Sequence, residues 1–157
     1  MTFLVVRSSV NINKRIHFIG LGGAGMSGIA RIMLAQGISI SGSDAKDSAV
    51  LSGLKTLGAQ VFIGHKESNI GDADILVVSS AIDQSNPEIM AASAKGLTIM
   101  TRAQALALLM SESKSVAVAG THGKTTTTSM LTVALQQAGL DPSFAIGGMI
   151  NRGGTNA

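Results

Sequence analysis

An α/β fold with a five-stranded parallel sheet is predicted for most of this 157-residue chain, followed by the start of a second α/β unit. From Arg15 onwards, short apolar runs alternate with stretches of helical periodicity, which is typical of parallel sheets with helical crossovers. Hydrophobic residues make up 45% of the sequence and charged residues 13%, so apolar side chains suffice for a buried core. Two glycine-rich segments each follow an apolar run and precede a helical pattern. These observations predict two α/β units in tandem.

The first unit is expected over residues 15–111. Its five strands are predicted at residues 16–19, 38–41, 60–63, 74–78 and 97–100. Helices are predicted at residues 25–36 and 48–57, with two more beginning near Asn86-Pro87-Glu88 and Thr101. Asn86 is a good capping residue, Pro87 suits the first helical position, and Glu88 is an acid facing the helix dipole. Thr101 and Gln104 form a capping box.

Residues 1–14 are interpreted as a short lead-in, and the polar stretch 111–115 as the boundary between units. Residues 112–157 then begin the second unit, with a strand at 116–119, a helix at 124–138 and a strand near 144–146. Residues 147–157 show no periodicity and no closing element. We therefore expect the chain to be a piece of a longer protein.

Composition excludes several classes of function. The net charge is +3, but the basic residues are scattered and no basic stripe with aromatics appears, so no nucleic-acid partner is expected. Cysteine is absent, which excludes disulfides and thiolate sites and fits a cytoplasmic location. No apolar run approaches the roughly 18 residues of a membrane span, and no signal peptide is recognisable.

The first glycine-rich loop places Gly20, Gly22 and Gly25 in a G-x-G-x-x-G frame between a strand and a helix. The first Gly permits a tight turn, the second lets the backbone approach a diphosphate, and the third allows close helix–strand packing. Asp44 follows 19 residues after Gly25, where an acid would meet a ribose. The alternative is a helix start that is glycine-rich only for packing. The frame favours a nucleotide diphosphate site without saying which nucleotide.

The second loop is Gly120-Thr121-His122-Gly123-Lys124-Thr125-Thr126, between a Val/Ala-rich strand and a helix. Amides in such a loop cradle phosphates, Lys124 would reach the terminal phosphates, and Thr125 would hold Mg²⁺. The usual spacing would place a Gly where Val118 stands, so this is a shortened form of the loop. The alternative is an accidental Gly-Lys-Thr in a surface turn, which the flanking strand and helix disfavour.

Other polar residues are open to more than one interpretation. Ser79 and Ser80 follow the fourth strand, where ligands bind in such sheets, although a solvated turn explains them equally well. His65 also lies beyond a strand end, yet a lone His is more often a hydrogen-bonded surface residue. His17, inside the first strand, is expected to be structural.

Three stretches, residues 17–28, 41–44 and 120–127, together resemble the Mur ligase family. The short second loop that opens on Gly120 is that family's form. Within the family, His122 and the segments 86–88, 101–103 and 141–142 look like the member that joins L-alanine to UDP-N-acetylmuramate. The resemblance covers about residues 15–150.

The resemblance implies ATP-dependent amide formation in peptidoglycan precursor synthesis, with ATP and Mg²⁺ as cofactors and UDP-N-acetylmuramate and L-alanine as substrates. Residues 15–111 would bind the UDP-sugar, and residues 112–157 would begin the central ATP-binding domain. Lys124 would be catalytic and Thr125 would hold the metal. The ATP site would comprise Gly120, Thr121, His122, Gly123, Lys124, Thr125 and Thr126. The UDP-substrate site would comprise Gly22, Gly23, Ala24, Gly25, Ser43, Asp44 and Ser80.

The implied family enzymes have three domains, so this chain alone is expected to bind the UDP-sugar without forming the amide bond. Three alternatives remain open at this point. One is a peptide-recycling ligase of the same family, a second is an NAD(P)-dependent oxidoreductase, and a third is a non-catalytic nucleotide-binding module. The oxidoreductase would leave the second loop unexplained.

Overall fold

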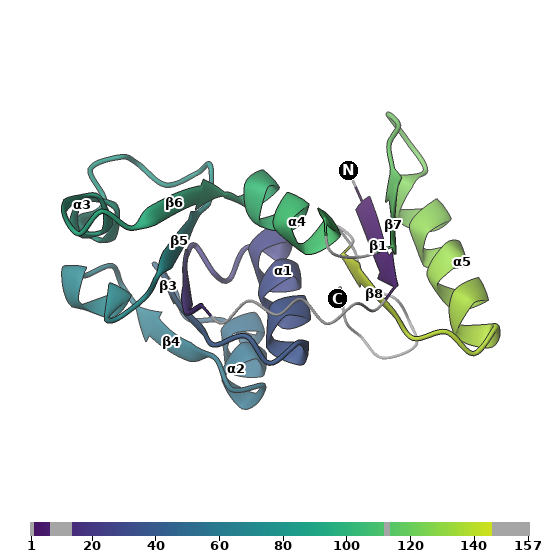
Figure 1. The fold of residues 1–157 in the computed structure, drawn as a ribbon, viewed down its shortest axis with the longest axis horizontal. Helices are drawn as coiled ribbons and strands as arrows, with labels where there is room; N and C mark the ends of the chain where they lie inside the picture. Colours follow the sequence, from purple (N-terminus) through teal and green to yellow (C-terminus); the bar gives the residue numbers. More distant parts are fainter. Residues whose placement is uncertain (1, 7–13, 112–113, 146–157) are drawn as a thin grey trace.

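Two sheets organise the chain, each with its own helices (Figure 1). The structure is a computed structural model that describes residues 2–6, 14–111 and 114–145. The first sheet is parallel, with strand order β4-β3-β2-β5-β6, and confirms the predicted five-stranded α/β fold. Its strands are β2 (Ile16–Ile19), β3 (Ile40–Asp44), β4 (Gln60–Ile63), β5 (Ile75–Val78) and β6 (Thr98–Thr101).

The helices lie on both faces of this sheet. They are α1 (Ala24–Ala35), α2 (Ala49–Thr56), the 3₁₀ helix η1 (Glu67–Ile70), α3 (Pro87–Ala94) and α4 (Arg102–Ser111). Side chains of α1, α2 and α4 share one buried cluster with Ile16 and Phe18, whereas η1 and α3 share another with Ile19. Successive strand residues point to opposite faces, so β2 contributes to both clusters.

Strand β3 begins two residues later than the periodicity predicted. Gly37 has a φ of +80° and ends α1, and the Ile38 amide then donates to the Met33 carbonyl at 3.0 Å. That amide is committed to closing the helix, so parallel pairing starts only where Ile40 meets Ile16.

The second sheet has the order β7-β1-β8 and is antiparallel. It consists of β1 (Thr2–Val6), β7 (Lys114–Val118) and β8 (Pro142–Ala145), with α5 (Lys124–Gln137) packed on it. The short lead-in predicted over residues 1–14 thus contains a strand at residues 2–6, which the sequence analysis did not predict. These residues pair with β7 and β8, which lie far away in the sequence and cannot be identified from local periodicity. The predicted segment 147–157 lies outside the described residues.

Gly42 is the tightest position in the first sheet. A Cβ there would lie 2.7 Å from the Phe18 carbonyl oxygen and 2.8 Å from Leu21 Cδ2. Because the backbone of β2 cannot move aside, we expect Gly42→Ala to lower the free energy of unfolding by about 2–3 kcal/mol in urea denaturation. Gly53→Ala in α2 is the matched control, since its nearest neighbour is the flexible end of Arg31 at 3.2 Å. That variant should gain about 0.5–1 kcal/mol from helix propensity, and equal stability of the two variants would contradict the argument.

Candidate functional site

The first glycine-rich loop lies at the topological switch point of the parallel sheet, where the order of the strands reverses. Strand β2 has β3 on one side and β5 on the other, and ligands of such sheets bind at the carboxyl ends of the strands at this switch. Gly20 has a φ of +81°, which only glycine adopts readily, and a Cβ there would lie 3.2 Å from Ser79 Cβ. The turn therefore closes against the end of β5.

Asp44 shapes this loop directly. Its Oδ2 accepts a hydrogen bond from the Gly22 amide at 2.8 Å, and its Oδ1 accepts one from the Lys46 amide at 3.3 Å. A Cβ on Gly22 would lie 2.9 Å from that same Oδ2. The predicted acid and the second glycine of the frame are thus one structural unit.

The N-terminus of α1 also lies at this carboxyl edge of the sheet, because the helix begins directly after the loop. Gly23 caps the helix without a side-chain hydrogen bond, and the first turn of the helix contains no acid, so no side chain of α1 itself pairs with its partial positive charge. Gly25 has a different role from the predicted helix–strand packing. A Cβ there would lie 3.0 Å from Arg102 Cδ and 3.0 Å from one guanidinium nitrogen. The absence of a side chain at Gly25 lets Arg102 approach the start of α1.

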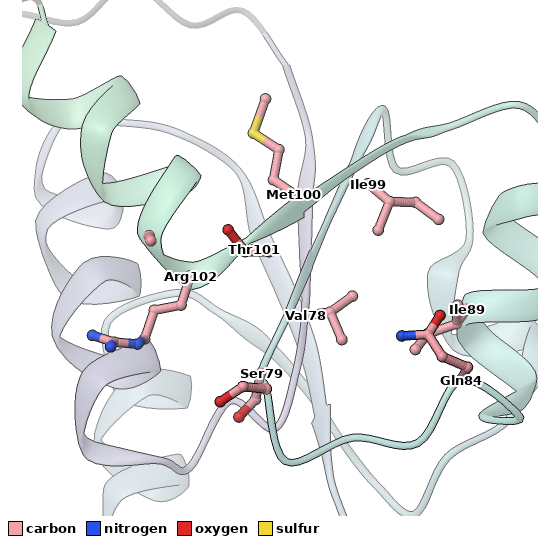
Figure 2. Close-up of a pocket in the computed structure, with 10 residues that line it drawn as sticks. Val78, Ser79, Gln84, Ile89, Ile99, Met100, Thr101 and Arg102 are labelled. Carbon is pink, nitrogen blue, oxygen red and sulfur yellow. The ribbon is translucent and has the colours of Figure 1, made fainter.

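A pocket of about 290 Å³ opens beside this loop, at the carboxyl ends of β5 and β6 (Figure 2). Its apolar walls include Val78, Ile89 and Ile99. Ser80, one of the predicted substrate residues, lies here, as does Arg102. The complete lining is Val78, Ser79, Ser80, Gln84, Ile89, Ile99, Met100, Thr101, Arg102 and Ala103. Arg102 was not among the site residues predicted from the sequence.

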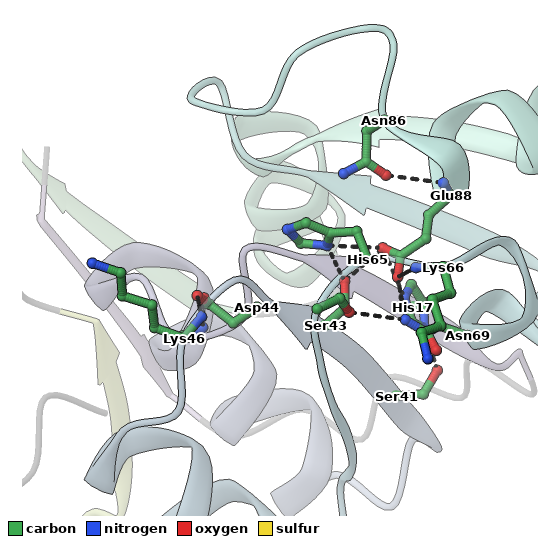
Figure 3. Close-up of polar contacts among 12 residues, drawn as sticks. His17, Ser41, Ser43, Asp44, Lys46, His65, Lys66, Asn69, Asn86 and Glu88 are labelled. Atoms are coloured by element: carbon green, nitrogen blue, oxygen red, sulfur yellow. Dashed lines mark hydrogen bonds and ion pairs between the residues drawn. The ribbon is translucent and has the colours of Figure 1, made fainter.

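On the other side of the loop, Ser43, one of the predicted substrate residues, is fully buried, and its side chain contacts other side chains of the protein. Its hydroxyl lies 2.5 Å from Glu88 Oε2 and 3.0 Å from His65 Nδ1 (Figure 3). The reason is the two-residue period of the strands. Ser43 shares a face of the sheet with Ser41 and His17, and α3 covers that face.

Glu88 is the centre of a buried polar cluster, which we call the Glu88 network. Its members are His17, Ser41, Ser43, His65, Lys66 (through its amide), Asn69 and Glu88. Asn69 Nδ2 donates to Glu88 Oε1 at 2.6 Å, and the Lys66 amide donates to the same oxygen at 3.3 Å. His17 Nε2 lies 3.6 Å from Oε2. Glu88 is in the first turn of α3 as predicted, but its side chain is turned inward and is 0% exposed.

The network keeps Glu88 charged. Burial alone would raise the pKa of this carboxyl, because it disfavours the charged form. The His17 imidazole, 3.6 Å away, and hydrogen bonds from Ser43 and Asn69 outweigh that effect and lower the pKa of Glu88 to about 2. The carboxylate is therefore a pure hydrogen-bond acceptor at neutral pH.

The second glycine-rich loop connects β7 and α5, as predicted. Gly120 has a φ of +154° and Gly123 a φ of +79°, and Gly123 caps α5. The Lys124 ammonium folds back over the loop, with Nζ 2.6 Å from the Gly120 carbonyl oxygen and 3.0 Å from that of Thr121. The remaining predicted residues of this loop, His122, Thr125 and Thr126, are exposed.

Thr125 is the one residue predicted to hold a metal. It lies in the first turn of α5, and the described residues contain no group of three or more His, Asp or Glu that could hold an ion. In enzymes with phosphate-binding loops, Mg²⁺ is held by the loop Ser or Thr hydroxyl together with phosphates, water and an acidic residue from another strand, so the exposed hydroxyl of Thr125 fits one position of such a shell.

Thus the structure brings the first loop, Asp44 and Ser80 together on one edge of the parallel sheet, and places the second loop on the other sheet. A family model described as "Mur ligase family, catalytic domain" matches residues 15–114. The chain belongs to the Mur ligase family. Within the described ranges, no helix is both long and apolar enough to cross a bilayer.

Individual members of the family agree closely in sequence with this chain. A UDP-N-acetylmuramate–L-alanine ligase of Renibacterium salmoninarum is 58% identical over 151 residues, covering 95% of this chain and 32% of the relative. The ligase of the same name from Thermobifida fusca is 53% identical, covering 100% and 34%. The chain thus spans about a third of the length of these curated relatives.

Solved structures agree with the fold. The UDP-N-acetylmuramate-alanine ligase of Thermotoga maritima superposes with a TM-score of 0.80 at 30% identity, covering 92% of this chain and 34% of that one. A UDP-N-acetylmuramate:L-alanyl-γ-D-glutamyl-meso-diaminopimelate ligase from Neisseria meningitides gives a TM-score of 0.73 at 32% identity, covering 92% and 46%. Both structures are Mur-type ligases, in agreement with the family assignment.

Proposed function

We propose that this chain is the nucleotide-binding part of an ATP-dependent ligase that joins L-alanine to UDP-N-acetylmuramate in peptidoglycan precursor synthesis. The observation that carries the proposal is the pair of unlike glycine-rich loops, one at the switch point of a parallel sheet and one with a lysine and a threonine at a helix start. The 53–58% identity to curated ligases with this activity supports it further.

The geometry suggests how the UDP-sugar would lie. Its diphosphate would meet the N-terminus of α1, with the Arg102 guanidinium beside Gly25 supplying further positive charge. Asp44 marks the β3 side of the loop, where an acid binds a ribose in related frames. The sugar would then extend toward the pocket at β5 and β6. The proposed contact residues are Gly22, Gly23, Ala24, Gly25, Asp44 and Ser80.

The second loop would supply the activating step. A carboxylate is a poor electrophile, and transfer of a phosphoryl group from ATP would convert it into an acyl phosphate that the amine of L-alanine attacks, with release of phosphate. The Lys124 ammonium would leave the loop carbonyls and pair with the terminal phosphates, and Thr125 would bind Mg²⁺. Gly120, Thr121, His122, Gly123 and Thr126 would complete the phosphate cradle.

Ligand-dependent thermal unfolding of the chain tests this proposal. UDP-N-acetylmuramate and ATP with Mg²⁺ should each raise the melting temperature, and NAD should not. Stabilisation by NAD without any by the UDP-sugar would refute it in favour of an oxidoreductase. Since the chain spans about a third of its curated relatives, we expect no amide formation from it alone. ADP release that depends on both other substrates would contradict that expectation.

A single substitution in the first loop should separate substrate binding from folding. Gly22→Ala places a methyl group 2.9 Å from Asp44 Oδ2 and displaces the amide that this oxygen binds. We expect the affinity for UDP-N-acetylmuramate, measured by calorimetry, to fall about 10- to 100-fold. The control is Gly53→Ala, the same change in a helix away from the loop. Unchanged affinity in Gly22→Ala would remove this loop from the substrate site.

A further inference from the structure

The Glu88 network ends at a histidine whose ring is not fully enclosed. His65 follows the end of β4, and the neighbouring Gly64 amide donates to the Asp44 carbonyl oxygen at 2.8 Å. The imidazole therefore belongs to the β3–β4 side of the carboxyl edge, next to the acid that binds the first loop. Its side chain is 19% exposed, whereas those of Glu88 and His17 are 0% exposed.

The position of each proton in this network follows from its donors and acceptors. Glu88 is ionised and carries no proton, so the 2.5 Å contact between its Oε2 and Ser43 Oγ must contain the hydroxyl proton of Ser43. A hydroxyl has only one proton to donate. The Ser43 oxygen must therefore act as the acceptor in its 3.0 Å contact with His65 Nδ1.

It follows that His65 carries a proton on Nδ1. In a neutral imidazole one nitrogen donates and the other accepts, so Nε2 has a free lone pair. Figure 3 shows that one ring nitrogen of His65 faces Ser43 and Glu88 and the other is turned away from them. Glu88 Oε2 also lies 3.5 Å from Nδ1, which favours the same tautomer electrostatically.

We propose that Glu88 is a positioning residue that, through the Ser43 hydroxyl, fixes the tautomer of His65 so that Nε2 accepts a hydrogen bond from the nucleoside of a bound nucleoside diphosphate. The inference rests on the proposed function for the location of the nucleoside. The ligand group must be a donor, and a nucleoside offers two kinds, a ribose hydroxyl and a base N–H. Ser43 acts indirectly, which explains why a predicted substrate residue is buried.

The tautomer is measured on the chain itself, without ligand. Long-range ¹H–¹⁵N correlation spectra of ¹⁵N-histidine-labelled protein at about pH 8 should show His65 protonated on Nδ1. Glu88→Gln should shift the tautomer population, because the amide can itself donate to Ser43. Glu67→Gln makes the same chemical change at an exposed side chain of η1 and should leave the spectrum unchanged. A proton on Nε2 in the unsubstituted chain would overturn the inference.

Calorimetry with UDP tests what Nε2 does. His65→Ala and His65→Asn should each weaken UDP binding about tenfold, whereas His65→Gln, whose amide oxygen reaches the Nε2 position, should retain most of the affinity. Analogues of UDP that lack the 2′-hydroxyl, the 3′-hydroxyl or the base N3–H identify the donor. The analogue that lacks the donor group should bind the unsubstituted chain about tenfold more weakly than UDP does. It should bind His65→Ala with the same affinity as UDP, because the partner of that group is already absent.

Two results distinguish a failure of the proposed function from a failure of the inference about His65. If UDP does not bind the unsubstituted chain at all, the proposed function and the nucleoside-facing role of Nε2 are both overturned. If UDP binds normally, but no analogue loses affinity in a His65-dependent way, the proposed function stands and the inference alone is overturned.

Discussion

Replacement of Glu88 by alanine is expected to lower the free energy of unfolding by about 3–5 kcal/mol, because it removes the acceptor of a buried, charged hydrogen-bond network. Asn69 Nδ2 and the Ser43 hydroxyl would each lose a partner now at 2.6 Å and 2.5 Å. A cavity would add to the cost. Urea denaturation followed by circular dichroism measures the loss. Glu67→Ala, at an exposed position, should change stability by less than about 0.5 kcal/mol.

The contribution of Glu88 has a specific pH dependence. Its pKa is lowered from 4.5 to about 2 in the folded chain. Because the pKa of Glu88 is lower in the folded state than in the unfolded state, its charged form stabilises the fold at pH values above the unfolded pKa. This stabilisation, about 3 kcal/mol, is lost as the pH falls from about 4.5 to 2. Asp74 and Asp83 also have lowered pKa values, through hydrogen bonds from Arg15 and Ser85. The difference in the free energy of unfolding between the unsubstituted chain and Glu88→Gln isolates the contribution of Glu88. If that difference does not change between pH 5 and about pH 2, Glu88 is not the acceptor described here.

Replacement of Lys124 by alanine is expected to weaken ATP binding about 10- to 100-fold, since each charge-assisted hydrogen bond contributes about 1.5–3 kcal/mol. The ammonium now bonds to the carbonyls of Gly120 and Thr121, so it is already held above the loop where phosphates would bind. The measurement is calorimetric titration of the chain with ATP and Mg²⁺.

The matched control for this prediction is Lys114→Ala. It removes the same charge from an exposed position in β7, on the strand that leads to the loop. ATP affinity should be nearly unchanged in that variant. Equal losses in the two variants would mean that general charge, and not the position of Lys124, attracts the nucleotide.

Local sequence patterns predicted much of the candidate site. The frame Gly20, Gly22 and Gly25 was recognisable because tight turns and close approaches need glycine wherever they occur. Asp44 was found by its distance from that frame, and its bond to the Gly22 amide gives it a structural role beside the predicted one. Lys124 could be proposed from the sequence because the residues of such a loop lie within one short segment.

Other site residues could not be found in this way. Polar residues at alternate positions of buried strands, such as His17, Ser41 and Ser43, were a signal that one face of the sheet needs a polar partner. The sequence could not show that this partner is Glu88, which is 45 residues from Ser43. Arg102 likewise meets Gly25 only because α4 follows β6 back across α1.

The sequence by itself determined the α/β class, the positions of the two glycine-rich loops and the order of elements, because each depends on neighbours within a few residues. Only the tertiary structure decided which polar groups are buried together, which is why Ser43 belongs to the Glu88 network and not to an open surface. It also decided that residues 2–6 form a strand between β7 and β8. Hydrogen-bond pairing across a sheet and burial beneath a helix depend on segments that are distant along the chain, and local periodicity carries no information about them.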